Sequence, residues 1–386
     1  MKIGSQNSHT LIDTYLKKSE RYSHLKILIL TPKLNIGGIT TYVLNLSSYL
    51  VSQAHEVHIA TPGGECVEAA VTIGCRIVPI QLSKSELHPG LFKTYKILKK
   101  YVLANKIQVL HCQSRATQVL GYWLGHATGS AYISTCHGLM KKRIHRKLFP
   151  YWGKHPIAVS HFVKGLMVND ARARESAVSV IYHGKAYREV EKEAQKKFCE
   201  IYGLERGAPL VGTICRLVSW KGCDYLVAAV PQVLQKWPRA QFVIVGEGEE
   251  RPFLEKLVCE LKIKNNIKFI GSLPKPEVFY SLCDMCVIPN RGSESFGFTV
   301  LEAMLYGKPI VLSDLPAMNE IIRGYREAHV VSPHDVKALA EKINYVLDSL
   351  TDLSQKAKND AEFIRQNFSL TSMGEKTLAI YKRSLN

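Results

Sequence analysis

The residues with the clearest chemical potential are two glutamates, Glu294 and Glu302, which stand eight positions apart on either side of the segment SFGF. An apolar run precedes this segment and a stretch of helical spacing follows it, so the carboxylates flank the start of a helix. Carboxylates can accept hydrogen bonds from the hydroxyl groups of a ligand. The alternative is structural, because Thr299 and Glu302 fit a Thr-x-x-Glu capping box and Glu294 would then be a loop carboxylate. Position alone leaves both interpretations open.

Two cations form a second candidate group. Arg216 and Lys221 lie five positions apart, at the end of the strand-like run PLVGTICRL and in the turn that follows it. Two cations that converge on one site suit a diphosphate that gains negative charge as it leaves. The alternative is a pair of exposed basic residues, and the position at the carboxyl end of a strand favours the binding interpretation.

Glycine-containing turns supply a third kind of candidate. Gly37 and Gly38 follow the first strand-like run, and Gly297 with Phe298 stands where a helix begins. Glycine lets backbone N–H groups come close to a phosphate or a sugar, and a helix N-terminus attracts an anion. For Gly37 and Gly38, a simple tight turn explains the sequence equally well.

The segment VIVGEGEER contains Gly246 and Gly248 and matches part of the dinucleotide-binding pattern G-x-G-x-x-G. Arg251 replaces the third glycine, and no acidic residue ends a strand about 20 positions further on, where a dinucleotide ribose needs one. A dehydrogenase is therefore disfavoured. We expect instead a glycine-rich turn beside a nucleotide.

The elements that must position these residues are short runs of Val, Ile and Leu between amphipathic stretches of helix length. Continuous apolar runs indicate strands buried on both faces, and the helices between them indicate right-handed parallel crossovers. Ligands bind beyond the carboxyl ends of such strands. We therefore predict an α/β fold of two doubly wound domains. The expected strands are 25–32, 56–62, 76–82, 107–114, 131–138, 155–160 and 179–184, then 209–217, 241–248, 267–273, 285–290, 308–314 and 328–333.

The length of 386 residues also suits two domains. We place the first domain at residues 1–184 and the second at 185–365, with 366–386 as a C-terminal helix that packs back on the first domain. The charged segment 185–198 is the expected connection between the two domains.

No apolar run is long enough to span a bilayer, and the N-terminal stretch lacks the apolar core of a signal peptide. The ten cysteines are scattered, mostly in apolar segments, which is typical of free buried thiols in a reducing compartment. Cys283 and Cys286 form a lone CxxC, for which packing is favoured over a zinc or redox role. We expect a cytoplasmic protein, and we also consider peripheral attachment to the inner face of the cytoplasmic membrane.

Positive charge is concentrated in the first half of the chain. The formal net charge is +18, and residues 1–185 hold 24 Lys and Arg against 8 Asp and Glu. Between Glu86 and Asp170 there is no acidic residue, and this stretch includes a basic cluster at 141–147. This concentration of positive charge favours a phosphorylated acceptor, an anionic membrane or nucleic acid as the partner.

The segment 91–103 could provide a membrane contact. Its spacing predicts a helix with Phe92, Tyr95, Leu98 and Val102 on one face, and with Lys93, Lys96 and Lys100 on another. A basic amphipathic helix can lie on an anionic leaflet. An ordinary crossover helix with a core face and a lysine face is an equally good interpretation.

Taken together, the motifs resemble those of the family 4 glycosyltransferases, the retaining class with an E-x7-E motif. They occur in order across about residues 25–325, and together they are specific whereas each alone is weak. Cys215 departs from the pattern, because the family often has glycine before the arginine. The matching segments are Glu294 to Glu302 for E-x7-E, Arg216 with Lys221-Gly222 for R-x4-K-G, Gly246 to Gly248 for VGxG, Gly37-Gly38 for the N-terminal loop, Thr135 to Gly138 for T-x-H-G, and Gln53 to Val57 for G-H-E-V.

The resemblance implies a GT-B fold, in which two Rossmann-like domains face a central cleft, the first binding the acceptor and the second a nucleotide-diphosphate sugar. It implies that the leaving diphosphate is stabilised by Arg216, Lys221 and the N–H groups around Gly297. Glu302 would bind the ribose, Glu294 the donor sugar, and His137 would face the transferred sugar. The implied catalytic residues are Glu294, His137, Arg216 and Lys221, and the implied donor-binding residues are Gly37, Gly38, Arg216, Lys221, Gly246, Glu294, Phe296, Gly297, Phe298 and Glu302.

No two aspartates lie two positions apart, so the D-x-D of metal-dependent glycosyltransferases is absent. We therefore expect no metal and no cofactor besides the donor substrate. The expected function is retaining hexosyl transfer to an anionic or membrane-linked acceptor, in the synthesis of lipopolysaccharide, glycolipid or cell-surface polysaccharide. A GT-B-like nucleotide-sugar epimerase is the alternative enzyme. A nucleic-acid-binding protein is less favoured because no recognition motif accompanies the basic charge, and no nucleic-acid partner is expected.

Overall fold

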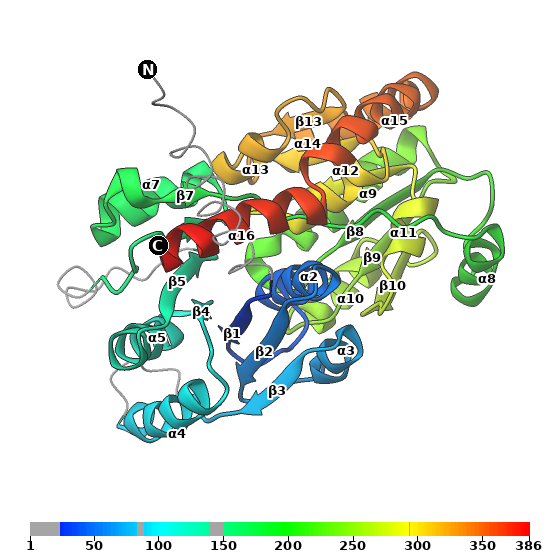
Figure 1. Ribbon diagram of the computed structural model, residues 1–386. Coiled ribbons are helices and arrows are strands. Elements are labelled where there is room, and N and C mark those ends of the chain that lie inside the picture. Colours follow the sequence, from blue (N-terminus) through cyan, green and yellow to red (C-terminus); the bar gives the residue numbers. More distant parts are fainter. Residues whose placement is uncertain (1–23, 83–88, 139–149, 293) are drawn as a thin grey trace, which may run out of the picture. The chain divides into compact units, whose positions relative to one another are not determined.

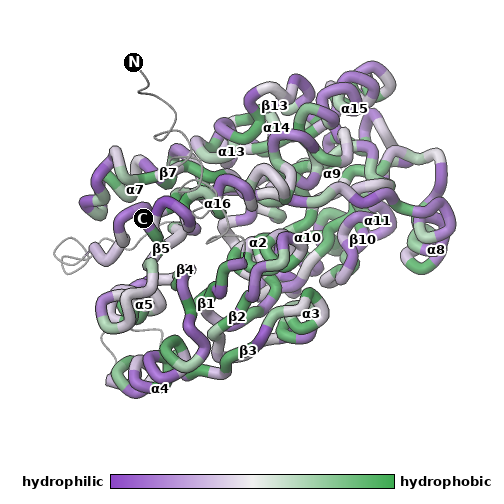
Figure 2. The backbone as a smooth tube through the Cα atoms, in the orientation of Figure 1, coloured by the Kyte–Doolittle hydropathy of each residue, from purple (hydrophilic) through white to green (hydrophobic). Residues whose placement is uncertain are grey.

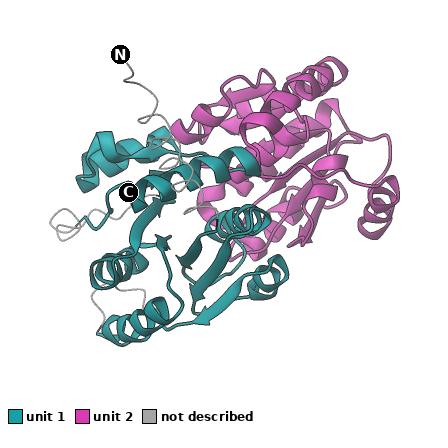
Figure 3. Ribbon diagram, in the orientation of Figure 1, with its two compact units in different colours: residues 1–184, 370–386 teal, residues 185–369 magenta. Residues whose placement is uncertain are grey.

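The computed structural model describes residues 24–82, 89–138, 150–292 and 294–386, and divides into two compact units. Unit 1 comprises Met1–Gly184 with Leu370–Asn386, and unit 2 comprises Lys185–Ser369 (Figure 3). The basic cluster at 141–147 lies outside the described residues. Each unit is built on one parallel sheet covered by helices (Figure 1), so the predicted α/β class with two doubly wound units is confirmed.

Within the described part of unit 1, seven parallel strands form a sheet in the order β3-β2-β1-β4-β5-β6-β7. The order runs outward in both directions from β1 and β4, and every expected strand of the first half is present. All residues of β4, and all of β1 after Lys26, are buried, as their apolar sequences require. The strands are β1 (Lys26–Leu30), β2 (Glu56–Thr61), β3 (Arg76–Pro79), β4 (Val109–Cys112), β5 (Ala131–Cys136), β6 (Ile157–Ala158) and β7 (Ser179–Val180).

The helices of unit 1 include the last helix of the chain. Helix α16 packs on α2 and β5, so the C-terminal segment belongs to unit 1 (Figure 1, red). The division from unit 2 falls between Ser369 and Leu370, because the preceding helix continues to Asn367. The helices are α2 (Gly38–Ser52), α3 (Val67–Ile73), α4 (Gly90–Ala104), α5 (Arg115–Thr128), α7 (His161–Ala171) and α16 (Leu370–Leu385).

A buried polar chain fixes α16 to the sheet. The hydroxyl of Tyr381 lies 2.7 Å from Nδ1 of His111, and Nε2 of His111 lies 2.7 Å from the hydroxyl of Thr135. His111 and Thr135 are the buried residues of β4 and β5 to which the helix is connected. These contacts give His111 a structural role within unit 1.

Unit 2 repeats the arrangement. Its described residues form a sheet of six parallel strands in the order β10-β9-β8-β11-β12-β13, and again every expected strand is present. Figure 2 shows hydrophobic residues along the strands and hydrophilic residues on the outer helices. The strands are β8 (Leu210–Ile214), β9 (Gln241–Val245), β10 (Ile267–Gly271), β11 (Met285–Ile288), β12 (Ile310–Ser313) and β13 (Ala328–Val331).

Helices cover this second sheet, with α14 packed on α9 and α15 packed on α12. The expected connection at 185–198 is irregular only up to the start of α8 at Lys192. The helices are α8 (Lys192–Tyr202), α9 (Cys223–Lys236), α10 (Arg251–Glu260), α11 (Glu277–Leu282), α12 (Phe298–Leu305), α13 (Pro316–Ile321), α14 (Val336–Asp348) and α15 (Leu350–Asn367).

The face expected for helix α4 is shifted. The buried residues are Leu91, Thr94, Leu98 and Val102, whereas Phe92 is 55% exposed. The reason is geometric, since Phe92 is one position, or about 100°, away from Leu91 and cannot share its stripe. Among the residues that the structure describes, no helix is long and apolar enough to cross a membrane.

Candidate functional site

The predicted cations and Glu294 come together in unit 2. Arg216 follows the carboxyl end of β8, and Lys221 ends the short turn Ser219–Lys221 before α9. The ammonium group of Lys221 donates to Oε2 of Glu294 in the loop after β11, and Nδ2 of Asn290 donates to the same oxygen at 2.9 Å. The side chains of Lys221 and Glu294 are only 14% and 19% exposed. A partly desolvated cluster therefore lies at the carboxyl ends of two neighbouring strands.

An aromatic ring supports both cations. The Lys221 ammonium lies 4.6 Å from the centroid of the Trp220 ring, and the Arg216 guanidinium lies 5.7 Å from it. A ring face attracts cations through its quadrupole. Arg216 is exposed, so its guanidinium is available to a ligand while Lys221 is held against Glu294.

Two glycines allow the backbone to pack this closely. An added Cβ at Gly222 would overlap the carbonyl oxygen of Pro289, and one at Gly246 would overlap the carbonyl oxygen of Cys215. Both glycines also have positive φ, 67° and 133°, where other residues are strained. The predicted glycine-rich turn at Gly246 thus packs directly on the segment that carries Arg216.

Glu302 has a different environment from Glu294. The ammonium group of Lys185 donates to Oε1 of Glu302, and the hydroxyl of Tyr280 donates to Oε2 at 2.7 Å. The Thr299 hydroxyl donates to the carbonyl of Ile214 at 3.1 Å, and Gly297, the N-cap residue of α12, makes no side-chain capping bond. The capping-box alternative is therefore wrong, because both of its side chains are engaged elsewhere.

Helix α12 begins between the two carboxylates. Gly297 has φ 94°, a left-handed conformation that turns the chain into the helix at Phe298. No side chain caps this end, so the positive end of the helix dipole keeps its attraction for an anion. Phe296 is buried, with its ring 5.6 Å from that of Phe298 and 6.5 Å from that of Phe368.

The remaining predicted residues lie in unit 1. Gly37 precedes α2, Gly38 begins it, and a Cβ at Gly37 would meet open space. His137 directly follows β5, and its Nε2 donates to Oε1 of Gln113 at 2.7 Å. Burial lowers the pKa of His137 to about 3, so the ring is neutral at physiological pH. Its Nδ1 has no hydrogen-bond partner within the described residues.

Two family models match this chain. Residues 36–184 match the family described as Glycosyltransferase Family 4, and residues 194–362 match the one described as Glycosyl transferases group 1. The two matches together span most of the sequence. The chain belongs to glycosyltransferase family 4. The resemblance to family 4 glycosyltransferases is confirmed, and the epimerase and nucleic-acid-binding alternatives are not favoured.

Relatives of this glycosyltransferase match it over four fifths or more of its length. An uncharacterised glycosyltransferase of Methanocaldococcus jannaschii is 26% identical over 93% of this chain and 98% of its own. A phosphatidyl-myo-inositol mannosyltransferase of Mycobacterium leprae is 25% identical over 80% of this chain and 83% of its own.

Solved structures confirm the fold of this glycosyltransferase. A glycosyltransferase from Rickettsia africae matches with a TM-score of 0.87 and 24% identity, covering 95% of this chain and all of the other. The Anabaena protein HepE in complex with UDP-glucose matches with a TM-score of 0.80 and 19% identity, covering 94% of this chain and all of the other. Two Rossmann-like units of the GT-B kind are thus established.

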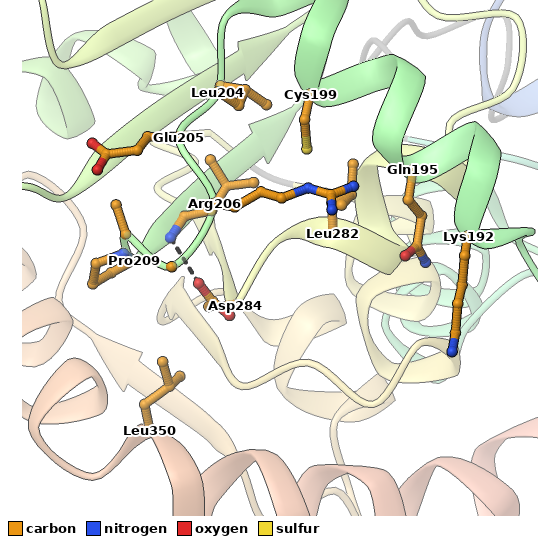
Figure 4. A pocket seen from close by; sticks show the side chains of 13 residues that line it. Lys192, Gln195, Cys199, Leu204, Glu205, Arg206, Pro209, Leu282, Asp284 and Leu350 are labelled. Carbon is orange, nitrogen blue, oxygen red and sulfur yellow. Dashed lines mark hydrogen bonds between the residues drawn. The ribbon is translucent and has the colours of Figure 1, made fainter.

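A cavity of about 520 Å³ in the glycosyltransferase lies away from the predicted site (Figure 4). It lies at the amino end of β8, and its lining includes Arg206, Leu210 and Asp284. The backbone N–H of Leu210 donates to Asp284 at 2.8 Å. Arg216 follows the opposite end of the same strand. No predicted site residue lines the cavity, so it is not the expected nucleotide site.

Four residues of the site were not identified from the sequence motifs. Trp220 and Asn290 contact the Lys221–Glu294 pair, and Lys185 and Tyr280 hold Glu302. Trp220 and Asn290 adjoin predicted motifs, which was a usable signal. Lys185 and Tyr280 come from distant segments, and no spacing connects them to Glu302. Across the described part of the chain, no cluster of His, Cys, Asp and Glu has the makeup of a metal site.

Proposed function

We propose that this glycosyltransferase moves a hexosyl group from a nucleotide-diphosphate donor to an anionic or membrane-linked acceptor, with retention of anomeric configuration and without a metal. The observation that carries the proposal is the cluster of Arg216, Lys221 and Glu294 at the carboxyl ends of β8 and β11. Ligands of doubly wound sheets bind at this edge. The cluster supplies two cations for a diphosphate and one carboxylate for a sugar.

The chemical requirement is separation of charge, since the sugar becomes oxocarbenium-like as the diphosphate leaves. In the proposed complex, Lys221 and Arg216 bind the phosphate oxygens and the N-terminus of α12 adds its dipole. Each well-placed donor of this kind is worth about 3 kcal/mol in the transition state. The leaving phosphate oxygen takes the proton of the acceptor hydroxyl on the same face of the sugar, so no carboxylate has to act as nucleophile.

The two carboxylates take separate roles in this proposal. Glu294 accepts hydrogen bonds from hydroxyls of the donor sugar once Lys221 turns to the phosphate. Glu302 accepts from the ribose hydroxyls with the lone pairs that Lys185 and Tyr280 leave free. His137 is neutral, and its Nδ1, without a partner in the described chain, can accept from a hydroxyl of the transferred sugar.

The donor class is supported by the Anabaena protein, whose crystal structure is a complex with UDP-glucose. A thermal-shift panel of UDP-, GDP- and ADP-sugars tests the proposal, because a ligand at 100 times its Kd adds about 2.7 kcal/mol to the free energy of unfolding. We expect one nucleotide sugar to stabilise the protein and Lys221→Met to remove the shift. Lys236→Met, which breaks an exposed pair with Asp348, is the control. No shift with any nucleotide sugar would overturn the donor proposal.

Retaining transfer is separable from epimerisation by incubating the protein with donor alone. We expect release of nucleoside diphosphate to require an acceptor, and the product to keep the anomeric configuration of the donor sugar in its NMR couplings. Conversion of the donor to an epimer in the absence of acceptor would support the alternative enzyme instead.

The acceptor proposal rests on the surface of α4 and on the phospholipid, phosphatidyl-myo-inositol, that the name of the Mycobacterium leprae relative gives. Phe92, Ile97 and Leu103 are 55%, 52% and 54% exposed on this helix. Lys93, Lys96 and Lys100 are exposed among them, with the Lys96 ammonium 4.8 Å from the Phe92 ring centroid. Apolar groups surrounded by lysines suit an anionic leaflet. We therefore propose a cytoplasmic protein that binds the inner face of the membrane peripherally.

Flotation with vesicles of phosphatidylglycerol and phosphatidylcholine tests this surface. We expect binding at low salt that weakens as salt rises, because a surface charge is screened over about 10 Å at 0.1 M salt. Phe92→Ser with Ile97→Ser should reduce binding at every salt concentration. Ile201→Ser, which changes a still more exposed apolar residue of unit 2, should not. Absence of binding at low salt would remove the membrane proposal and leave the donor chemistry in place.

A further inference from the structure

Two cysteines enclose the segment that carries both predicted phosphate-binding cations. Cys215 directly precedes Arg216, and Cys223 begins α9 two residues after Lys221. Their sulfur atoms lie 3.4 Å apart. The residues between them therefore form a short loop, 216–222, whose two ends meet at a pair of thiols.

The surroundings of the pair favour reaction at Cys215. The pKa of Cys215 is lowered first by its hydrogen bond with the Cys223 thiol and then by Lys221 and Arg216, against the opposing effect of burial. The pKa of Cys223 is raised by the same hydrogen bond and by burial. Cys215 is also partly exposed, whereas Cys223 is buried. The thiolate is the nucleophile in disulfide chemistry, so Cys215 is the attacking sulfur and Cys223 the resolving one.

We propose that Cys215 and Cys223 form a reversible disulfide, which closes the loop 216–222 and controls the cation site. The oxidant is a low-molecular-weight disulfide, RSSR. The Cys215 thiolate attacks one sulfur, forms a mixed disulfide and releases RS⁻. Cys223 loses its proton and attacks the Cys215 sulfur, which forms the Cys215–Cys223 bond and releases the second RS⁻. The two protein thiols are oxidised, RSSR is reduced to two thiols, and excess thiol reverses both steps.

We expect oxidation to move the loop that carries the cations. A disulfide needs its sulfurs about 2.05 Å apart, closer than the present separation. The two ends of the loop are held, since the carbonyl of Cys215 packs against Gly246 and Gly222 packs against the carbonyl of Pro289 without room for a Cβ. The backbone adjustment therefore falls on residues 216–221, and it draws Arg216 and Lys221 away from their positions beside Trp220 and Glu294. The expected loss of diphosphate affinity rests on the proposed function, whereas disulfide formation does not.

A second thiol pair in the same unit provides a comparison. The sulfurs of Cys283 and Cys286 lie 3.5 Å apart, but both residues are fully buried and the segment between them carries neither cation. Cys215 is only partly buried. Proximity is thus shared by the two pairs, and so is a nearby cation, since Lys308 also lowers the pKa of Cys283. The partial exposure of Cys215, and the two cations on the segment that it joins to Cys223, distinguish the first pair.

The disulfide can be detected directly in the full-length protein. Trypsin cleaves after Arg216 and after Lys221, so Cys215 and Cys223 fall in different peptides that stay joined only when oxidised. After treatment with oxidised glutathione we expect a linked peptide that dithiothreitol separates. Cys223→Ser should abolish the linked peptide, whereas Cys259→Ser, which removes an exposed cysteine of α10, should leave it intact. Absence of the linked peptide from the oxidised native chain would overturn the proposal.

Binding measurements then test the control of the site. Titration with UDP, GDP and ADP should show at least tenfold weaker affinity for the preferred nucleotide after oxidation, full recovery with dithiothreitol, and no change on oxidation of Cys215→Ser, which lacks the attacking sulfur. A linked peptide with unchanged affinity would overturn the control while the proposed function stands. If the reduced protein bound no nucleotide, the proposed function and this control would both fail, and the linked peptide would still establish the disulfide.

Discussion

At the scale of single residues, the two glutamates differ in what holds them. Glu294 lies in a loop with Lys221 and Asn290, and Glu302 lies inside α12 with Lys185 and Tyr280. Removing the charge from Glu302 leaves Lys185 with an uncompensated charge at a mostly buried position, 17% exposed. The two carboxylates should therefore respond differently to the same substitution.

We predict that Glu302→Gln raises the Kd for nucleotide about tenfold and costs about 2 kcal/mol of stability, because a partly buried charged hydrogen bond is broken. Glu294→Gln should lower kcat about 100-fold with a smaller change in nucleotide Kd. The reason is that the proposed hydrogen bonds from the donor sugar to Glu294 act mainly in the transition state. Calorimetric titration and initial rates separate the two effects. The control is Glu341→Gln, at an exposed helical pair with Lys337. Equal, mild effects from both site variants would contradict the division of roles.

Trp220 gives a second prediction at this scale. Its ring faces both Lys221 and Arg216, and each cation–ring contact is worth about 0.5–1 kcal/mol. Trp220→Leu should raise the KM for donor about fivefold to tenfold, whereas Trp220→Tyr should recover most of the loss. If leucine and tyrosine behaved alike, the ring would be acting through its bulk and not through its π-face.

The sequence predicted the charged residues of this site more fully than their partners. Arg216, Lys221 and Glu294 follow strand ends and match spaced motifs, so they could be assigned without coordinates. Lys185 could not, since a lone lysine in a charged segment carries no signal that it will reach a helix 117 positions away. The capping-box alternative could be removed only by seeing Thr299 bonded to the end of β8.

At the scale of elements, the central strands were predictable because strands buried on both faces are continuous apolar runs. The edge strands β3 and β13 are less buried but still contain short runs of Ile and Val. The buried faces of the helices were harder to predict. In α4 both Leu91 and Phe92 suit an apolar stripe, and the stripe through Leu91, Thr94, Leu98 and Val102 is the one that packs. A threonine in the core stripe and a phenylalanine outside it reverse the simple hydrophobic pattern, which is why the sequence misplaced Phe92.

The contact between α16 and α2 gives a prediction about these elements. An added Cβ at Gly374 would overlap the ring of Tyr49, whereas one at Gly165 in α7 would meet open space. Gly374→Ala should destabilise unit 1 by about 2 kcal/mol through overpacking, and Gly165→Ala should be neutral or stabilising by up to about 1 kcal/mol. Chemical denaturation of both variants measures the difference. Equal stability would mean that α16 can move away from α2 at no cost.

At the scale of the whole molecule, the buried histidines make the stability of unit 1 depend on pH. Burial, with a smaller contribution from His137, lowers the pKa of His111 to about 3, and its ring is bonded to Tyr381 and Thr135. His111 takes up a proton near pH 6.5 in the unfolded chain, whereas in the folded chain its pKa is about 3. The unfolded state therefore holds more protons in this window, and stability falls as pH decreases from 6.5 toward 3.

Each such histidine contributes a slope of at most about 1.4 kcal/mol per pH unit. We predict that His111→Gln lowers the free energy of unfolding of unit 1 at pH 7.5. Between pH 6 and pH 4.5 the variant should lose stability less steeply than the native protein, with a slope that corresponds to about one proton fewer taken up on unfolding. Urea unfolding across this range measures the slope, and His334→Gln, at a histidine on the surface of unit 2, should keep the native slope. A variant slope equal to that of the native protein would mean that His111 is protonated in the folded state, so that α16 is held by a charged bond and not by a neutral one.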